Sequence, residues 1–355
     1  MGLDILISVD DTPNQNLTTQ VSSVEVYEKM DQNTSYKLKF MVDICDGDIA
    51  DQIQKDSSPG KILSVLAKVH ENMVCLVKGP VAQQQAHLVH GGAGSWLHVE
   101  GEDNGHLMDR ETTFRQTPSG SDADIASSII SSHNSMTADV EPTPGSVHNE
   151  ENHTHIQRDT DLNMLRSLAR RNGYHFWITW QPDGAATGHF RSRDLDGTPA
   201  ATLIVNQENY NIDSLRVTAD THRPSQIVGS QLDLRTKQVI DGSQTLNDTP
   251  LGSSSLADVS GPVLESMHLA PTVDNSGAMQ ARSRGALRDA QWFINATCST
   301  NIDRLCKIVR YHTIVEVQGA GNRYSGKYYV TGVKHIIDAS AYKMELELAR
   351  NAWGN

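Results

Sequence analysis

The stretch YYVTGVKHIIDASAYKMELELARN, residues 328–351, decides the fold because it has the pattern of an antiparallel hairpin. Over residues 343–348 polar and apolar side chains alternate, which is typical of a strand with one buried face. Residues 328–337 are rich in Tyr, Val and Ile, and the short polar residues 338–341 suit a reversal between two strands. The sequence therefore predicts a β-hairpin in this stretch.

A second stretch with the same pattern lies upstream, in residues 76–103. Residues 77–81 resemble residues 330–333, the glycine-rich residues 91–95 form a predicted turn, and an alternating strand follows over residues 96–100. More strand-like sequence precedes each hairpin. We interpret the chain as a duplicated β-domain at its two ends, with two unrelated β-meanders as the alternative.

Helical patterns occupy the middle of the chain. Ser121 and Asp124 resemble a capping box at the start of an amphipathic helix. A second helix is predicted to begin at Asp159 or Thr160 and to stop at Gly173, with a strand after it. A third is predicted over residues 277–295, where apolar residues share one face. The Ser-, Gly-, Pro- and Asp-rich residues 241–276 indicate an exposed loop or an arm that orders on a partner.

The composition excludes several classes of function. The chain has 355 residues and a formal charge of −13, which disfavours a nonspecific nucleic-acid binder or a protein of anionic membrane surfaces. No apolar run approaches the length of a membrane span, and residues 1–10 lack the basic start of a signal peptide. We therefore expect synthesis in the cytoplasm. The four cysteines form no CxxC pair and are predicted to be buried or partly buried free thiols: Cys45, Cys75, Cys298 and Cys306.

The segment HNEENHTHIQ is the strongest candidate for a metal or catalytic site in the chain, because three histidines lie within eight residues. The weak metal-ligand candidates are His148, His153 and His155, of which the last two would share one side of a strand. A polar loop that happens to be rich in histidine is the other interpretation. No HExxH, GxSxG, P-loop or dinucleotide-binding motif is present, so no catalytic residue, cofactor or firm metal site is predicted.

Five segments together resemble a known family. In chain order they are LHVEGEDNGHLMDRE, SDADIASSII, RDTDLNMLRSLARRNGYHFWI, YSGKYYVTGVKHII and LELARN. Their order and spacing resemble the late control D family of contractile phage tails. That family is similar to the hub half of type VI secretion spike proteins of the VgrG kind and to hubs of extracellular injection systems. The resemblance covers about residues 76–351.

The resemblance implies a structural baseplate hub that is not an enzyme. A homotrimer of such hubs joins a hexameric inner tube to a separate trimeric spike, next to other baseplate components, in a phage tail or contractile injection particle. The implied fold is α+β and mainly β, with two barrels similar to the tube protein flanking a small α+β domain. The predicted boundaries are 1–103, 104–200 and 201–355, the last with the 241–276 loop and the 277–295 helix.

The resemblance also implies an assembly surface on the two hairpins. Exposed strands would pair with neighbouring subunits, and their polar faces would line or border the tube lumen. The interface residues implied in this way are Lys343, Glu345, Glu347, Trp96, His98 and Glu100.

Other functions stay open. Because spike proteins of the type VI kind continue past the hub and the sequence ends at Asn355, we expect a separate spike protein. A metal-dependent hydrolase that uses the histidines of residues 148–155 is the alternative from another class. An adaptor or terminator placed elsewhere in the tube is a third possibility, and the kind of particle is left open.

Overall fold

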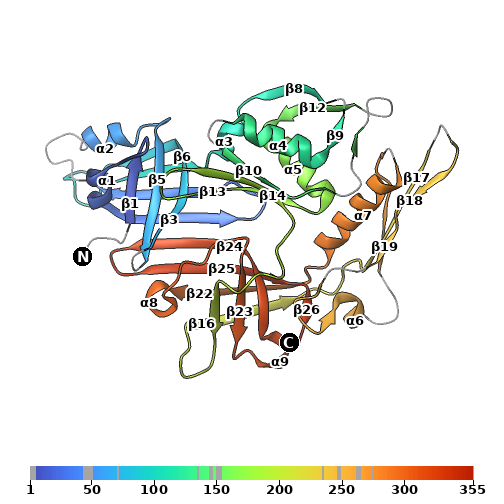
Figure 1. Cartoon of the computed structure of the whole chain (residues 1–355). Coiled ribbons are helices and arrows are strands. Elements are labelled where there is room, and N and C mark those ends of the chain that lie inside the picture. The colour runs from blue at the N-terminus through green and yellow to red at the C-terminus, as the bar shows by residue number, and fades with distance from the viewer. Residues whose placement is uncertain are drawn as a thin grey trace.

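Figure 1 shows the computed structural model, whose ribbon combines a large sheet with a helical unit beside it. The structure describes residues 5–42, 51–69, 72–117, 119–133, 136–143, 147–148, 154–233, 236–245, 249–260, 265–273 and 275–354. No helix within these ranges is long and apolar enough to cross a membrane.

The elements fall into three consecutive stretches of the chain. The first contains β1 (Ile5–Val9), β2 (Thr12–Pro13), α1 (Gln15–Gln20), β3 (Val21–Lys29), β4 (Ser35–Met41), α2 (Asp51–Asp56), β5 (Ile62–Val69), β6 (Asn72–His87) and β7 (Trp96–Glu102). The second contains α3 (Gly105–Met108), β8 (Thr112–Thr117), β9 (Gly120–Ser121), α4 (Asp122–Ser132), β10 (Met136–Val140), β11 (Val147–His148), β12 (His155–Thr160), α5 (Asp161–Asn172), β13 (His175–Trp180) and β14 (Ala186–Arg191). The third contains β15 (Ala201–Ile204), β16 (Ile212–Ala219), β17 (Gln226–Leu232), β18 (Val239–Asp241), β19 (Gln244–Thr245), β20 (Ser254–Ser255), α6 (Leu256–Ser260), β21 (Ser266–Leu269), α7 (Ser276–Ala290), β22 (Ile294–Asn301), α8 (Ile302–Leu305), β23 (Ile314–Gln318), α9 (Gly321–Tyr324), β24 (Gly326–Asp338), β25 (Tyr342–Arg350) and β26 (Ala352–Trp353).

The fold is α+β and mainly β, as predicted, but its large sheet is continuous. Its strands follow the order β16-β22-β25-β24-β3-β4-β7-β6-β5-β1-β2, and β23 joins beside β24. The expected picture of two separate barrels needs correction here, because β24 pairs with β25 on one edge and with β3 on the other. Among the described strands no pairing closes either half of the sheet on itself.

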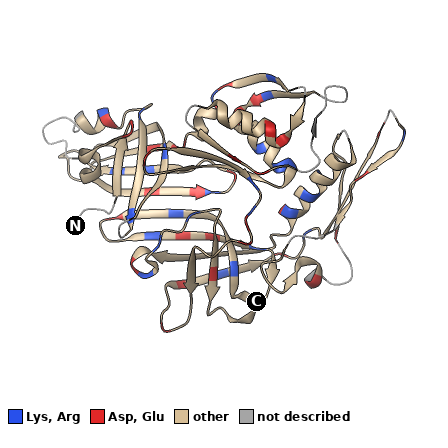
Figure 2. Cartoon of the chain, in the orientation of Figure 1, with Lys and Arg blue, Asp and Glu red and all other residues tan. Residues whose placement is uncertain are grey.

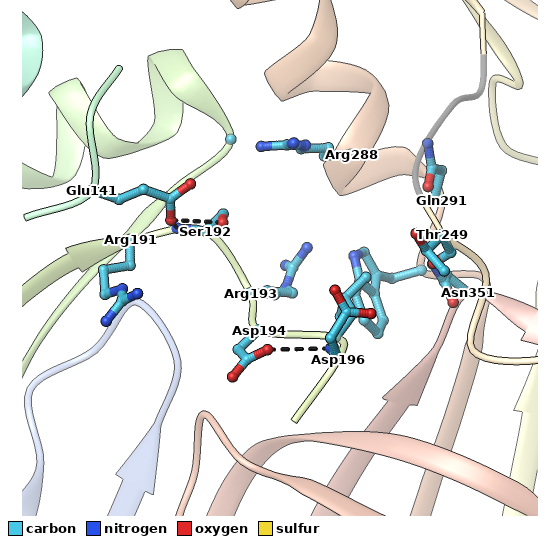
Figure 3. A pocket seen from close by; sticks show the side chains of 13 residues that line it. Glu141, Arg191, Ser192, Arg193, Asp194, Asp196, Thr249, Arg288, Gln291 and Asn351 are labelled. Carbon is cyan, nitrogen blue, oxygen red and sulfur yellow. Dashed lines mark hydrogen bonds between the residues drawn. The ribbon is translucent and has the colours of Figure 1, made fainter. Parts of the chain in front are cut away.

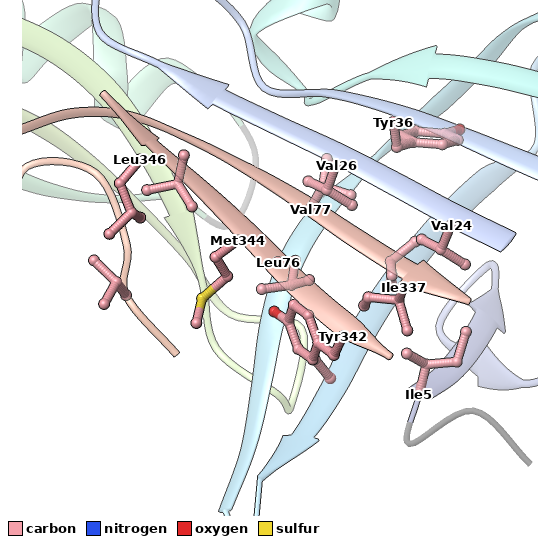
Figure 4. Packing of buried hydrophobic residues seen from close by; sticks show 14 of the residues in the cluster. Ile5, Val24, Val26, Tyr36, Leu76, Val77, Ile337, Tyr342, Met344 and Leu346 are labelled. Carbon is pink, nitrogen blue, oxygen red and sulfur yellow. The ribbon is translucent and has the colours of Figure 1, made fainter. Parts of the chain in front are cut away.

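The core of the sheet draws on both ends of the chain. Figure 4 shows Val24 and Val26 of β3 close to Ile337 of β24 and Tyr342 of β25. One apolar cluster joins these residues with others from the first and third stretches, and a second cluster lies mainly in the middle stretch. Burial of apolar side chains from both ends in one cluster therefore holds the two β-regions together.

The two hairpins form as the alternation predicts. Along β25 the side chains of Met344, Leu346 and Leu348 are buried, while Lys343 and Glu345 are exposed and Glu347 is half-buried. The strands β6 and β7 pair antiparallel, and residues 91–95 lie in the turn between them. The alternation predicted the buried face correctly in both hairpins.

The first two predicted helices are confirmed in detail. Ser121 and Asp124 form a capping box at the start of α4, and the Thr160 hydroxyl accepts from the Asn163 N–H at the start of α5. Gly173 ends α5 in the left-handed region, at φ 68°, where glycine carries no steric cost.

The third predicted helix is too long. Helix α7 ends at Ala290, and β22 begins at Ile294, so Phe293 and Ile294 are buried in the sheet core instead of on a helix face. The reason lies in residues 294–301, which alternate between buried and exposed and pair with β16 and β25. Residues 241–276 contain short strands and α6 in their described parts.

Candidate functional site

The six residues predicted for the interface lie at matching positions in the two halves of the sheet. On β7 the side chains of Trp96, His98 and Glu100 are half-buried, and they alternate with the buried Leu97 and Val99. The residues Lys343, Glu345 and Glu347 alternate in the same way with buried residues of β25. Both strands therefore present a polar face opposite the apolar core.

The two halves repeat one strand order. In the first half the sheet runs β3-β4-β7-β6-β5, and in the second it runs β16-β22-β25-β24, with β23 beside β24. Each half has five strands, which we number 1 to 5 in chain order. In both halves the strands lie side by side in the sheet in the order 1-2-5-4-3. We call these halves module 1 (β3 to β7) and module 2 (β16 and β22 to β25).

Irregularities of pairing also repeat between the modules. The β6–β7 register shifts between Val81 and Gln83, and the β24–β25 register shifts between Val330 and Gly332. The first strands carry a second shared irregularity, after Val21 in β3 and after Ile212 in β16. Because a bulge fixes register, these coincidences align the modules residue by residue.

Individual residues of the two modules are equivalent under this alignment. In the fifth strands, Val99 pairs with Leu38 and Leu346 pairs with Cys298. These pairs make Val99 equivalent to Leu346, and by the same count Trp96, His98 and Glu100 are equivalent to Lys343, Glu345 and Glu347.

Ion pairs cross the polar face between strands of the large sheet. Lys29 of β3 lies 3.1 Å from Glu347 of β25, Lys37 of β4 lies 2.7 Å from Glu100 of β7, and Lys334 of β24 lies 3.0 Å from Glu25 of β3. Figure 2 shows that Lys, Arg, Asp and Glu occur along the strands of the large sheet. All six side chains are partly exposed, so each pair contributes roughly 0–1 kcal/mol. The face is charged but locally compensated.

A buried ion network holds module 1 to module 2. Glu28 of β3 is fully buried and contacts Arg310, which precedes β23, and His335 of β24 at 3.5 Å. Arg310 also donates to the backbone carbonyl of Cys75 in β6 at 2.9 Å, and the Tyr342 hydroxyl lies 2.9 Å from His335 Nδ1. The network thus ties together strands that come from both ends of the chain.

Burial and charge act in opposite directions on this network. Burial raises the pKa of Glu28, but the charge of Arg310 and the contact with His335 outweigh it, so the pKa is lowered. Burial lowers the pKa of His335, and Glu28 offsets only part of that effect. Glu28 is therefore ionised and His335 neutral near pH 7.

The predicted histidine cluster is only partly described. His148 belongs to β11, His153 lies outside the described residues, and His155 is buried on β12. Over the described ranges, no group of three or more His, Cys, Asp or Glu side chains is arranged to hold a metal ion. The metal candidates therefore stay predictions.

A polar cavity of about 440 Å³ lies between the end of β14, helix α7 and the C-terminal residues (Figure 3). Glu141 accepts hydrogen bonds from the N–H and hydroxyl of Ser192, and the Arg193 guanidinium lies 4.6 Å from the ring centre of Trp292. The second contact joins the middle of the chain to the third stretch, because Trp292 lies between α7 and β22. We interpret the cavity as a packing junction, because Glu141 and Arg193 each contact a neighbouring residue of the lining.

Sequence reasoning missed the buried network, although one signal was present. Glu28 follows Val24 and Val26 at the spacing of one strand face, so the alternation places a carboxylate on the apolar side. A charge in that position needs a buried partner. The sequence does not show that the partners are Arg310 and His335, about 300 residues away.

Comparison with solved structures finds the same fold in tail proteins. A tail protein from Neisseria meningitidis MC58 is 17% identical with a TM-score of 0.66, over 99% of this chain and 98% of that one. The 43 kDa tail protein of prophage MuSo2 from Shewanella oneidensis is 14% identical with a TM-score of 0.65, over 98% of each chain. At such identities the likeness shows the fold alone.

A further structural relative is a component of the type VI secretion system of E. coli, described as similar to the T4 bacteriophage tail proteins gp27 and gp5. It is 11% identical with a TM-score of 0.57, over 98% of this chain and 78% of that one. A family model described as Alg8 N-terminal domain matches residues 3–339. No curated protein matches the chain.

Proposed function

This chain belongs to the Alg8 N-terminal domain family, and we propose that it is the structural baseplate hub of a contractile tail or injection particle. The observation that carries the proposal is the repeated strand order of the two modules. The fold shared with phage tail proteins and with a type VI secretion component supports it. In this role the chain is a scaffold and not an enzyme.

Three copies of a chain with two equivalent modules present six modules around one axis. A homotrimer can then match a hexameric inner tube on one side while it keeps threefold symmetry for a trimeric spike on the other. We propose these two partners, together with other baseplate components. The polar face with Lys343, Glu345, Glu347, Trp96, His98 and Glu100 borders the lumen of the ring or meets a neighbour.

The division of the chain into residues 1–103, 104–200 and 201–355 belongs to this proposal. Each outer part supplies one module similar to a tube protein, curved within a shared ring and not closed as a barrel of its own. The middle part supplies the α+β unit. Burial of apolar residues from both outer parts in one cluster supports a rigid pair of modules.

The two ends of the sheet differ, which supports an orientation in the particle. At one end lie two equivalent hairpin turns: residues 88–95, between β6 and β7 of module 1, and residues 339–341, between β24 and β25 of module 2. At the other end Ser35 pairs with Glu102, and the chain leaves there for the middle unit. At that same end Ala219 of β16 pairs with Ile294 of β22, and residues 220–293 are inserted between these two strands. In module 1 only a short turn connects the equivalent strands, β3 and β4.

We propose that the end with similar hairpin turns faces the sixfold tube. The opposite end carries an insertion in every second module of a six-module ring, so it has threefold symmetry and faces the spike.

The proposal is tested by measuring the oligomeric mass of the purified protein and its binding to the tube and spike proteins. Light scattering is expected to give a trimer, and tagged hub is expected to co-purify with tube protein and with spike protein. A stable dimer that binds neither partner would refute the hub assignment. A photo-crosslinker in residues 338–341 is expected to capture the tube protein, and its capture of the spike would reverse the orientation.

A further inference from the structure

The joint between the two modules within one chain shows how two modules meet. Residues 332–338 of β24 pair antiparallel with residues 23–29 of β3, with Lys334 opposite Tyr27 and Ile337 opposite Val24. β24 has this edge free because β23 pairs only with its first residues, 326–329. The joint buries Val24, Val26 and Ile337 almost completely.

Among the described strands, none pairs with the equivalent edges at the other sides of the two modules. In module 1, β5 pairs with β6 only up to Pro80, and residues 83–87 pair with β7 alone among the described strands. In module 2, β16 is the terminal strand of the sheet and pairs with β22 alone within the described chain. One chain therefore carries one edge of each kind.

Apolar side chains on these edges are more exposed than their equivalents in the joint. Leu215 and Val217 of β16 are half-buried, whereas the equivalent Val24 and Val26 of β3 are 0% exposed. Leu88, directly after β6, is 54% exposed, whereas the equivalent Ile337 is 2% exposed. Each difference is what removal of a neighbouring strand produces.

We propose that β16 of a second copy pairs antiparallel with residues 83–88, in the register that β24 uses with β3. This inference rests on the proposed trimer and names the surfaces that close it. The register places Gln85 opposite Thr218, and Leu88 against Leu215. It also places His87 opposite Arg216 of the second copy. An edge strand satisfies its unpaired backbone groups by such addition.

The chemistry of the joint between copies differs from that of the joint within the chain. The equivalents of Glu28 and His335 are Ala219 and Ala86, so no buried ion network crosses between copies. The ion pair of Lys334 with Glu25 is replaced by Gln85 and Arg216. Backbone hydrogen bonds and apolar contacts hold the joint, and trimer formation is therefore expected to be nearly insensitive to salt.

Disulfide trapping tests the register. The double variant Gln85→Cys with Thr218→Cys, in a background with Cys45→Ser and Cys306→Ser, is expected to give covalent trimers on oxidation. Opposite residues of paired strands approach within disulfide range, at roughly 4.5–5.5 Å between Cα atoms. The matched control, Gln85→Cys with Arg216→Cys, is displaced by two residues and is expected to stay uncrosslinked.

A second variant tests the edge without cysteines. Leu88→Asp is expected to shift the trimer toward monomer in light scattering. Leu232→Asp, in β17, changes a leucine of the same 54% exposure and is expected to leave the trimer intact. Both variants are expected to keep the wild-type circular dichroism spectrum, because both side chains are exposed.

The outcomes separate this joint from the function on which it rests. A trimer that binds tube protein but gives no Gln85–Thr218 crosslink, in solution or in assembled particles, overturns the joint and leaves the hub assignment standing. Crosslinking of the displaced pair alone overturns the register. A wild-type chain that neither trimerises nor binds tube and spike proteins overturns the proposed function together with the joint.

Discussion

The most direct consequence of the alternation along β25 is that the adjacent residues Leu346 and Glu345 respond oppositely to a change of charge. Leu346 is 1% exposed and lies between Cys298 of β22 and Val333 of β24. Glu345 is exposed on the other face. Leu346→Asp should therefore damage folding, and Glu345→Lys should spare folding but disturb docking to the tube or to neighbouring subunits.

The magnitude follows from two contributions. Loss of a buried leucine side chain costs about 2–5 kcal/mol, as in Leu→Ala changes. A buried aspartate without a partner becomes neutral, and keeping it protonated at pH 7 costs about 4 kcal/mol relative to its ordinary pKa of about 3.9. The sum, about 6–9 kcal/mol, is comparable to the whole free energy of unfolding of a typical domain, about 5–15 kcal/mol.

Urea unfolding followed by circular dichroism measures these effects, and co-purification with tube and spike proteins measures docking. Leu346→Asp is expected to be unfolded or insoluble, and Leu346→Ala is expected to lose about 2–5 kcal/mol. Val99→Asp should repeat the damage in module 1, because Val99 is equivalent to Leu346 and is 0% exposed. If Leu346→Asp folds normally while Glu345→Lys unfolds the chain, the assigned faces of β25 are reversed.

Three further predictions follow from the buried residues and the histidines. Glu28→Gln leaves Arg310 without its buried partner and is expected to cost about 3–5 kcal/mol in urea unfolding, whereas the exposed control Glu25→Gln is expected to cost less than about 1 kcal/mol. Acid is expected to destabilise the chain as pH falls below about 6.5: the pKa of His335 is lower in the folded state, so the unfolded state binds the proton first. Thermal unfolding between pH 7.5 and 5 measures this loss, and a flat profile would contradict the neutral buried histidine. A triple alanine variant of the histidine segment should keep trimer assembly and lose no bound metal by elemental analysis, and loss of both would favour the metal site. Its positions are His148, His153 and His155.

The sequence determined the local structure of this chain to a large extent. Alternation in residues 343–348 identified which side chains of β25 are buried, because successive residues of a strand point to opposite faces. Ser121, Thr160 and Gly173 marked helix ends, because their local hydrogen bonds or backbone freedom act within a few residues. The similarity of the two hairpins also pointed to a duplicated domain, but it matched residues 77–81 to residues 330–333, whereas the strand pairing makes Val81 equivalent to Val330.

Only the tertiary structure decided how these parts join. Alternation specifies the buried face of a strand but not its neighbour, so the pairing of β24 with β3, which makes one sheet of two expected barrels, could not be read from either segment. For the same reason the sequence did not identify the partners of Glu28. The helix predicted over residues 277–295 was too long, because pairing with β16 and β25 makes residues 294–301 a strand. Contacts between residues about 300 positions apart depend on the packing of the whole chain, because no local pattern records which distant strand will supply the free edge.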